Sequence, residues 1–253
     1  MPTPRLVQIQ AWSYSRFQTY EQCPQKSKYQ VIDKLKEPDG AAGMKGTRVH
    51  ALAAVWVSRQ LPPLDKDNTA FYPELEALVK AKKIPVELET FEVEFGLLRR
   101  NKTAQVEQQW TFNRDWEDMG EQGWFSSQAW LRIKVDEHHL EVKKNGALRR
   151  TTVHIVDYKT GREYEDHALQ RSLYALGAFL KYPDAERVTA AHWYLDAGVE
   201  RKQEWARAVL PALQAEWVKR TTAMLNDTTY APRPSDKCRY CWFRKANNGP
   251  CKF

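Results

Sequence analysis

One short stretch carries most of the information about this chain: His154-Ile155-Val156-Asp157-Tyr158-Lys159-Thr160-Gly161. Its apolar, β-branched start predicts a strand over Val153–Tyr158, and Thr160-Gly161 then turns the chain. Side chains alternate between the two faces of a strand, so Asp157 and Lys159 are expected on the same face. A carboxylate and an ammonium group should therefore lie side by side at the end of a strand.

A second carboxylate follows another apolar run, the expected strand Trp130–Asp136. If this strand neighbours the first one, Asp136, Asp157 and Lys159 converge at one end of a sheet. Like charges packed together need a cation, and hard oxygen ligands suit Mg²⁺ or Mn²⁺. The two strands therefore predict a divalent-metal site, provided that they pair.

The next helix is expected to cover this site. In the predicted helix Asp166–Lys181, four leucines recur at helical spacing and form the face that packs on the core. Gln170 and Tyr174 are four residues apart and lie about 100–140° away from that stripe, with Gly177 between the two faces. Taken in isolation, Gln170 and Tyr174 could equally be ordinary residues at the rim of the core.

The remaining periodicity predicts a mixed sheet covered by helices. Asn145-Gly146 is expected to form a hairpin turn, and Ala197-Gly198 a second turn that leads into a partner strand from Val199. Further helices are predicted over Ser13–Val31 with a break near Pro24, from Thr47 as N-cap, over Glu74–Lys83 and over Trp205–Leu225; further strands are predicted over Leu88–Phe95, Ala104–Phe112, His139–Val142 and Val188–Asp196.

Composition narrows the class of protein. The chain has 253 residues, of which 42% are hydrophobic, and a formal net charge of +7. It is expected to form one continuous domain with an anionic partner, nucleic acid being the first candidate. Four cysteines are too few for a disulfide scaffold of this size. We find neither the apolar core of a signal peptide nor an apolar stretch long enough to span a bilayer, so a cytoplasmic protein without membrane contact is expected.

Four sequence patterns occur in a fixed order: Gly46-Thr47-Arg48-Val49-His50, Val135-Asp136, Asp157-Tyr158-Lys159-Thr160-Gly161, and Gln170 to Tyr174. This ordered set resembles the PD-(D/E)XK nuclease superfamily and, within it, the RecB-like exonucleases, over nearly the whole chain. The resemblance implies an α/β fold with a restriction-endonuclease-like core, in which helices flank a mixed β-sheet. It also implies an Asp that closes a hairpin strand, which is Asp136 here.

The resemblance implies a role for each of these residues. Asp136, Asp157 and His50 would bind one or two Mg²⁺ or Mn²⁺ ions, with the backbone carbonyl of Tyr158 as a further ligand. Lys159 would position the attacking water or stabilise developing negative charge, and Gln170 and Tyr174 would orient the phosphate or the lysine. From the residues alone, His50 beside an apolar helix face could also be a partly buried structural histidine.

Three of the four cysteines lie close together at the end of the chain. Cys238-Arg239-Tyr240-Cys241 forms a CxxC knuckle, Cys251 follows it, and Cys23 stands far upstream. One CxxC is moderate evidence for metal or redox chemistry, whereas a zinc ribbon normally has two such knuckles. The spacing favours a metal site without deciding which metal it holds.

The cysteine pattern also resembles the iron–sulfur subset of RecB-like nucleases, which includes AddB-type and CRISPR-associated members. There one cysteine precedes the nuclease core and three follow it. This implies a [4Fe–4S] cluster on Cys23, Cys238, Cys241 and Cys251, with Zn²⁺ as the alternative, inside a single domain of residues 1–253. Residues 13–35 and 227–253 would form the cluster region and clamp the two chain ends together, a constraint on the order of 4–5 kcal/mol by disulfide-type estimates.

Two functions from different classes are compatible with these patterns. The first is a metal-dependent DNA exonuclease that hydrolyses phosphodiester bonds in single-stranded or end-bearing DNA during recombination, repair, or phage or CRISPR DNA processing. The second is a non-catalytic nucleic-acid-binding module with a Cys₄ zinc site. All the catalytic residue types are present, which favours the first. The chain has no Walker A motif, so unwinding would require a helicase or a recombination or CRISPR partner.

Overall fold

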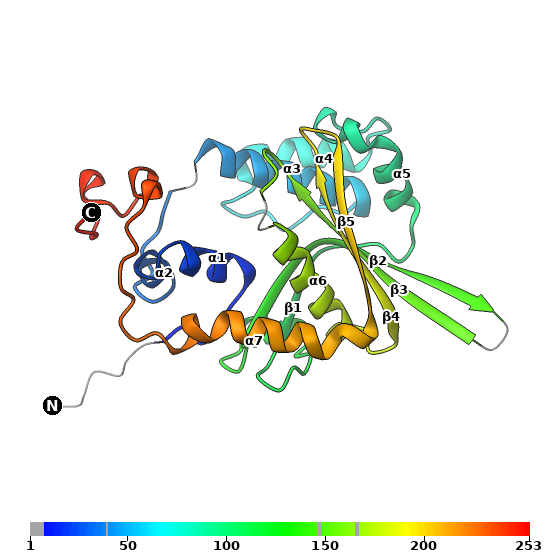
Figure 1. Ribbon diagram of the computed structural model, residues 1–253. Helices are drawn as coiled ribbons and strands as arrows, with labels where there is room; N and C mark the ends of the chain where they lie inside the picture. The colour runs from blue at the N-terminus through cyan, green and yellow to red at the C-terminus, as the bar shows by residue number, and fades with distance from the viewer. Residues whose placement is uncertain (1–7, 39, 146–147, 165–166) are drawn as a thin grey trace.

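The computed structural model describes residues 8–38, 40–145, 148–164 and 167–253 and shows a five-stranded mixed sheet flanked by helices (Figure 1). The strands lie in the order of the sequence: β1 Gln105–Phe112, β2 Leu131–Asn145, β3 Leu148–Lys159, β4 Ala185–Tyr194 and β5 Val199–Ala206. Only β3 and β4 pair in parallel. A parallel pair needs a crossover, and α6 (His167–Lys181) provides it. The predicted α/β class with a mixed, helix-flanked sheet is confirmed.

Helices cover both faces of this sheet and create two cores. Alternation along β3 serves both: Val153 and Ile155 pack beneath α6, whereas Val156 and Tyr158 pack against α3 on the other face. The first face is covered by α1 (Tyr14–Gln22), α6 and α7 (Leu210–Asn226), and the second by α3 (Ala41–Ser58), α4 (Tyr72–Val79) and α5 (Glu92–Arg100). The end of β3, with Asp157 and Lys159, therefore lies between two packed layers.

The C-terminal segment lies on the same side of the molecule as α1 and α2, away from the β2–β3 hairpin (Figure 1). Ser13 caps α1 by accepting a hydrogen bond from the Arg16 amide, as the turn-forming serine predicts. The helix then breaks at Cys23, and Pro24 begins α2 (Pro24–Val31), as predicted. The C-terminal segment, which contains only short 3₁₀ turns after α7, lies against α2.

The structure overturns one predicted strand. Residues 88–95 form a 3₁₀ helix (Val86–Phe91) that leads into α5, not a strand. Leu88, Phe91 and Phe95 recur every three to four residues, and all three are buried in the core beneath α3. The strand was predicted because this segment is rich in β-forming residue types. A helix forms instead because the helical spacing puts the apolar side chains on one face, which can then be buried.

Several boundaries also differ from those predicted. Helix α3 begins at Ala41 after Gly40, and the Thr47 hydroxyl donates to the Gly43 carbonyl within the helix instead of capping it. β2 runs unbroken through the two strands predicted there, so Asp136 lies within a strand and does not close it. Trp205 belongs to β5, which delays the start of α7 to Leu210. The predicted Asn145-Gly146 turn lies partly outside the described residues.

Within the described parts of the chain, we find no helix with the length and apolar character needed to cross a membrane.

Candidate active site

The end of β3 carries the carboxylate and ammonium expected there. Asp157 is only 3% exposed, and the Lys159 Nζ atom lies 2.7 Å from its Oδ2 atom. Both side chains point to the α6 side of the sheet, as strand alternation predicts. Burial by itself would raise the pKa of Asp157, yet the charge of Lys159 lowers it to about 2. Asp157 is therefore an anion at neutral pH.

Helix α6 brings Gln170 and Tyr174 onto this pair. The Tyr174 hydroxyl donates to Asp157 Oδ1, and Gln170 Nε2 donates to the Tyr174 oxygen at 2.8 Å. Gln170 Oε1 in turn accepts from Lys159 Nζ at 2.9 Å. The four side chains form one hydrogen-bonded group, so neither Gln170 nor Tyr174 is an ordinary rim residue.

Asp136 reaches the same place from β2. Its Oδ2 accepts from the Tyr158 amide at 2.8 Å, although 22 residues separate them in sequence. The β2–β3 pairing explains this contact: Glu137 pairs with Val156, so Asp136 lies across from Asp157. The two predicted strands are therefore neighbours, and Asp136, Asp157 and Lys159 converge as expected.

His50 approaches from α3 on the other face of the sheet. Its Nδ1 lies 3.2 Å from Asp136 Oδ1, and its side chain is 30% exposed. Val49, Leu52 and Ala53 are buried in the core, and His50 lies at the edge of that buried face. Burial lowers the pKa of His50, but the nearby Asp136 carboxylate outweighs burial and raises it to about 9.

Glu107 on β1 is a site residue that our sequence interpretation missed. One ligand atom each from His50, Glu107 and Asp136 lies within 4.8 Å of the others, which is close enough for a shared metal ion. Burial and the Asp136 charge raise the pKa of Glu107, and Lys134 at 2.6 Å partly offsets this. The donor set, two carboxylates and an imidazole, suits Mn²⁺ well and Mg²⁺ through its oxygens.

A local break in the alternation of side chains along β1 places the Glu107 carboxylate next to that of Asp136. Val106 packs against the α3 core, whereas Trp110, an even number of residues along β1, is buried in the α6 core. Between them Glu107 adopts a left-handed φ of 53°, a conformation that costs energy for a non-glycine residue and is common at functional sites. Val106 pairs with Glu137 and Gln108 with Val135, which places Glu107 opposite Asp136. The sequence pattern does not reveal such a break, because β1 is polar at several other positions as well.

A buried histidine lies behind the Asp157 carboxylate. His192 on β4 is the pairing partner of Asp157, is fully buried, and has its Nε2 3.7 Å from Asp157 Oδ2. Arg171 Nη1 lies 3.1 Å from His192 Nδ1 and donates to it. Burial lowers the pKa of His192 to about 3, so the ring is neutral and carries its proton on Nε2, toward Asp157. The sequence offered no sign of this contact.

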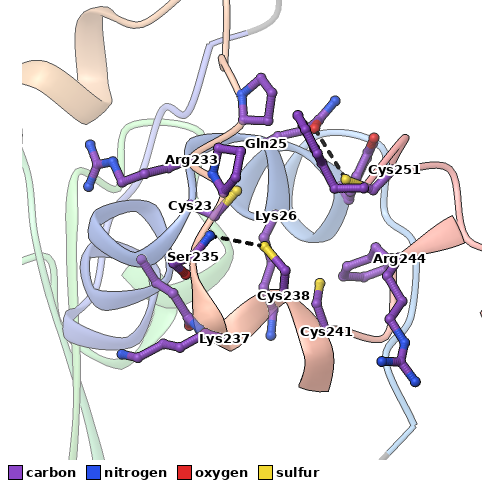
Figure 2. A pocket seen from close by; sticks show the side chains of 16 residues that line it. Cys23, Gln25, Lys26, Arg233, Ser235, Lys237, Cys238, Cys241, Arg244 and Cys251 are labelled. Carbon is purple, nitrogen blue, oxygen red and sulfur yellow. Dashed lines mark hydrogen bonds between the residues drawn. The ribbon is translucent and has the colours of Figure 1, made fainter. Parts of the chain in front are cut away.

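The four cysteines line one small cavity between α2 and the C-terminal segment (Figure 2). All four are free thiols. Among the described residues, no three cysteine sulfurs come within the 4.8 Å found for the His50 group. A zinc ion with Zn–S bonds of about 2.3 Å would bring sulfurs to about 4 Å of one another. A [4Fe–4S] cluster binds each thiolate on a different iron and so tolerates wider spacing.

Aromatic packing holds this cavity in place. Phe243 is 2% exposed and contacts the Tyr29 ring of α2, with ring centroids 5.3 Å apart. The Cys251 amide donates to the Phe243 carbonyl at 2.9 Å, which folds the last residues back. A Cβ atom at Gly249 would lie 2.3 Å from the Phe243 backbone, so only glycine fits there. The Ser235 amide also donates to the Cys238 sulfur at 3.4 Å.

Comparisons with known proteins identify the family of this chain. No curated protein matches the chain. One similar solved structure is a protein of Eubacterium rectale whose exonuclease assignment is provisional; it has 13% identity and a TM-score of 0.49, and the match covers 91% of this chain and 88% of that one. Another is SSO0001, with 16% identity and a TM-score of 0.30 over 91% of this chain and 96% of that one. A family model, the PD-(D/E)XK nuclease superfamily, matches residues 11–246. The chain therefore belongs to the PD-(D/E)XK nuclease superfamily.

Proposed function

We propose that this nuclease is an Mg²⁺- or Mn²⁺-dependent DNA exonuclease of the RecB-like group. The observation that carries the proposal is the convergence of Asp136, Asp157 and Lys159 from two paired strands, with His50 and Glu107 on the other side of Asp136. The ordered sequence patterns support the RecB-like assignment, and the net charge of +7 suits a polyanionic substrate.

The chemistry of the donor set fits a hard divalent cation. His50, Glu107 and Asp136 would hold it, and Asp157 and the Tyr158 carbonyl are the further ligands that the family resemblance implies. A bound divalent ion lowers the pKa of a coordinated water and neutralises charge on the scissile phosphate. His50 has a raised pKa, so it must release its proton before it can bind a metal.

Lys159 acts as a fixed positive charge. Burial lowers its pKa, but the Asp157 carboxylate more than compensates and raises it, so the amine stays protonated. It is held by Asp157 and Gln170, and from there it can position the attacking water or stabilise negative charge on the phosphate. The Tyr174 hydroxyl donates to Asp157 and thereby fixes the direction of its carboxylate.

We also propose a [4Fe–4S] cluster on Cys23, Cys238, Cys241 and Cys251, with a structural role. Its support is that all four cysteines line the same cavity. The cluster would join residues 13–35 to residues 227–253 within one domain of residues 1–253. Cysteines without disulfide bonds suit a reducing compartment, so we place the protein in the cytoplasm. Its role there would be in recombination, repair, or phage or CRISPR DNA processing. Any helicase that works with it would be a separate protein.

A cleavage assay tests the proposed activity. End-labelled single-stranded DNA, blunt duplex, covalently closed circular DNA and an RNA strand are incubated with Mg²⁺, Mn²⁺ or EDTA. We expect metal-dependent loss of the DNA substrates that have ends, with the closed circle intact. Asp157→Asn and Lys159→Ala should each abolish cleavage, whereas the exposed-site controls Asp184→Asn and Lys202→Ala should keep it.

Three results would contradict this proposal. Cleavage of the closed circle would exclude an exonuclease, and degradation of RNA alone would exclude DNA as the substrate. Full activity in both active-site variants would refute the site.

For the cluster, we expect a brown protein with about four irons and four labile sulfides per chain. A colourless protein with one zinc would reject the cluster.

A further inference from the structure

A second cavity opens directly beside the catalytic group. Its volume is about 500 Å³, and Lys159, Gln170 and Tyr174 line one end of it. The lining continues to the start of α1 and to the beginning of β2, where Arg16 and Arg132 face it. This volume is within the range of about 300–1,000 Å³ that binds small ligands, which is enough for one nucleotide unit.

The cavity has one sign of charge. Four cationic side chains line it, and no Asp or Glu is among its described lining residues. Lys134 and Lys159 already contact carboxylates, Glu107 and Asp157 respectively, whereas Arg16 and Arg132 have no carboxylate partner among the described residues. Anions are therefore drawn to the arginine end of the cavity.

The two arginines, Arg16 and Arg132, line the same cavity. Arg16 Nη1 donates to the Ala11 carbonyl at 2.6 Å, and the Arg132 Nε atom is buried without a hydrogen-bond partner among the described residues. Burial and then the charge of Arg132 lower the pKa of Arg16. A phosphate between them would satisfy both guanidinium groups.

The backbone keeps this spacing rigid. The Trp12 amide donates to the Trp130 carbonyl at 2.8 Å, and the Arg132 amide donates to the Trp12 carbonyl at 2.9 Å. The chain that enters α1 is thus fastened to the start of β2. Arg16 and Arg132 belong to these two fastened segments, so their separation does not depend on a flexible loop.

An aromatic side chain completes the cavity. Trp124 lies in the 3₁₀ turn Glu121–Phe125, lines the cavity, and has its ring centroid 5.9 Å from the Arg132 guanidinium carbon. The next residue, Phe125, is 90% exposed. Aromatic rings beside a cationic groove are the usual means of binding single strands, because an unpaired base can stack on them.

We propose that this cavity binds one nucleotide of a single strand next to the scissile phosphate, with the neighbouring phosphate between Arg16 and Arg132 and the base against Trp124. The proposal rests on the proposed function and adds the strandedness of the substrate at the site. Next to a scissile phosphate inside a duplex, a paired base has both faces covered by its neighbours in the stack, so it cannot stack on Trp124 until the strands separate there. Duplex ends must therefore be opened by at least one nucleotide before cleavage.

Binding measurements without divalent ion test this, because binding is then separated from cleavage. Fluorescence anisotropy is measured with a fluorescein-labelled oligothymidylate, the same strand containing abasic sites, and a blunt duplex, in EDTA. We expect Trp124→Ala to weaken binding to the normal strand about tenfold, a typical value for loss of one stacked base. Trp124→Phe should retain most of the affinity, and neither change should affect the abasic strand.

The arginine is tested by its salt dependence. Arg132→Gln should weaken binding to both the normal and the abasic strand and reduce the slope of log K against log salt by about 0.7, the loss of one phosphate contact. The matched control is Arg187→Gln. Arg187 lies on β4 and forms an exposed ion pair with Glu204 on β5, so this change should leave the slope unchanged. Melting temperatures confirm that each variant is folded, and Arg132→Lys keeps the charge should Arg132→Gln prove unstable.

The outcomes separate this proposal from the enzyme activity. If the wild type cleaves DNA and Trp124→Ala and Arg132→Gln bind the strand as tightly as it does, the cavity is not the strand site although the nuclease assignment stands. Tighter binding of duplex than of single strand, without any effect of Trp124→Ala, also overturns the proposal. A wild type that binds DNA as proposed but does not cleave it in any metal would refute the activity alone.

Discussion

Asp136 joins the two halves of the candidate site. One carboxylate oxygen faces His50 and the other accepts from the Tyr158 amide, which leads along β3 to Asp157 and Lys159. Its contacts use both oxygens, so the direction of the carboxylate is fixed before any metal binds. Preorganised ligands of this kind avoid a reorganisation cost when the metal enters.

Glu107 should contribute directly to metal affinity. Its carboxylate lies with the His50 imidazole and the Asp136 carboxylate around one position, and removal of its charge leaves one fewer anionic oxygen for the cation. We expect Glu107→Gln to weaken Mn²⁺ binding by at least about tenfold, comparable with losses seen on altering groups around a metal. Isothermal titration calorimetry measures this, with Glu216→Gln on α7 as the control. An unchanged affinity in Glu107→Gln would remove Glu107 from the ligand set.

His50 should make the metal-free protein less stable at alkaline pH. Its folded pKa of about 9 is above the unfolded value of 6.5 because the protonated ring pairs with Asp136. This stabilisation is complete below pH 6.5 and is lost as pH rises through about 9. The melting temperature in EDTA should therefore fall between these values in the wild type and fall less in His50→Gln. Equal slopes for the two proteins would show that the pair contributes nothing.

At the scale of elements, α6 and β3 position Asp157, Lys159, Gln170 and Tyr174, and both elements were predictable from the sequence. The leucine stripe of α6 leaves one possible orientation on the sheet, and that orientation directs Gln170 and Tyr174 toward the end of β3. The segment Leu88–Phe95 was predicted wrongly because short apolar runs satisfy both strand and helix patterns. Packing against α3 in the folded protein selects the helix, and this contact cannot be predicted from the local sequence.

Gly177 sets how closely α6 approaches the sheet. A Cβ atom there would lie 2.4 Å from Ile133 Cδ1 and 3.3 Å from the Trp110 ring, both in the core. We expect Gly177→Ala to destabilise the fold by about 1–2 kcal/mol, since overpacking costs more than the helix propensity gained. Gly43→Ala, in α3 with open space around it, should be neutral or stabilising. Urea denaturation compares the two variants, and equal stabilities would contradict tight packing at Gly177.

At the scale of the whole molecule, one sheet separates two cores, and the C-terminal segment packs against α2 (Figure 1). The candidate site lies where the two cores adjoin, because α3 supplies His50 from one side and α6 supplies Gln170 and Tyr174 from the other. Separation of either layer from the sheet would dismantle the site. The cysteine region is distant in sequence from this centre, which is consistent with a structural role.

The packing of the C-terminal segment, residues 232–253, against α2 should depend on Gly249. A methyl group there would collide with the Phe243 backbone, which cannot move without displacing the ring from Tyr29. We expect Gly249→Ala to increase amide hydrogen exchange in residues 232–253 and to lower the iron content, with exchange in the sheet unchanged. Gly43→Ala serves as the control. Wild-type exchange throughout residues 232–253 would show that this packing does not depend on Gly249.

Local spacing was enough to predict the Asp157–Lys159 strand, the Gln170–Tyr174 helix and the break at Cys23–Pro24, because each depends on residues that are neighbours within one element. Glu107 and His192 could not be found in this way. They reach the site through strand pairing, opposite Asp136 and beside Asp157, and the alternation break at Glu107 appears only when β1 and β2 pair. Local periodicity determines what an element is and which face it buries, whereas pairing between distant strands determines which side chains from those elements meet.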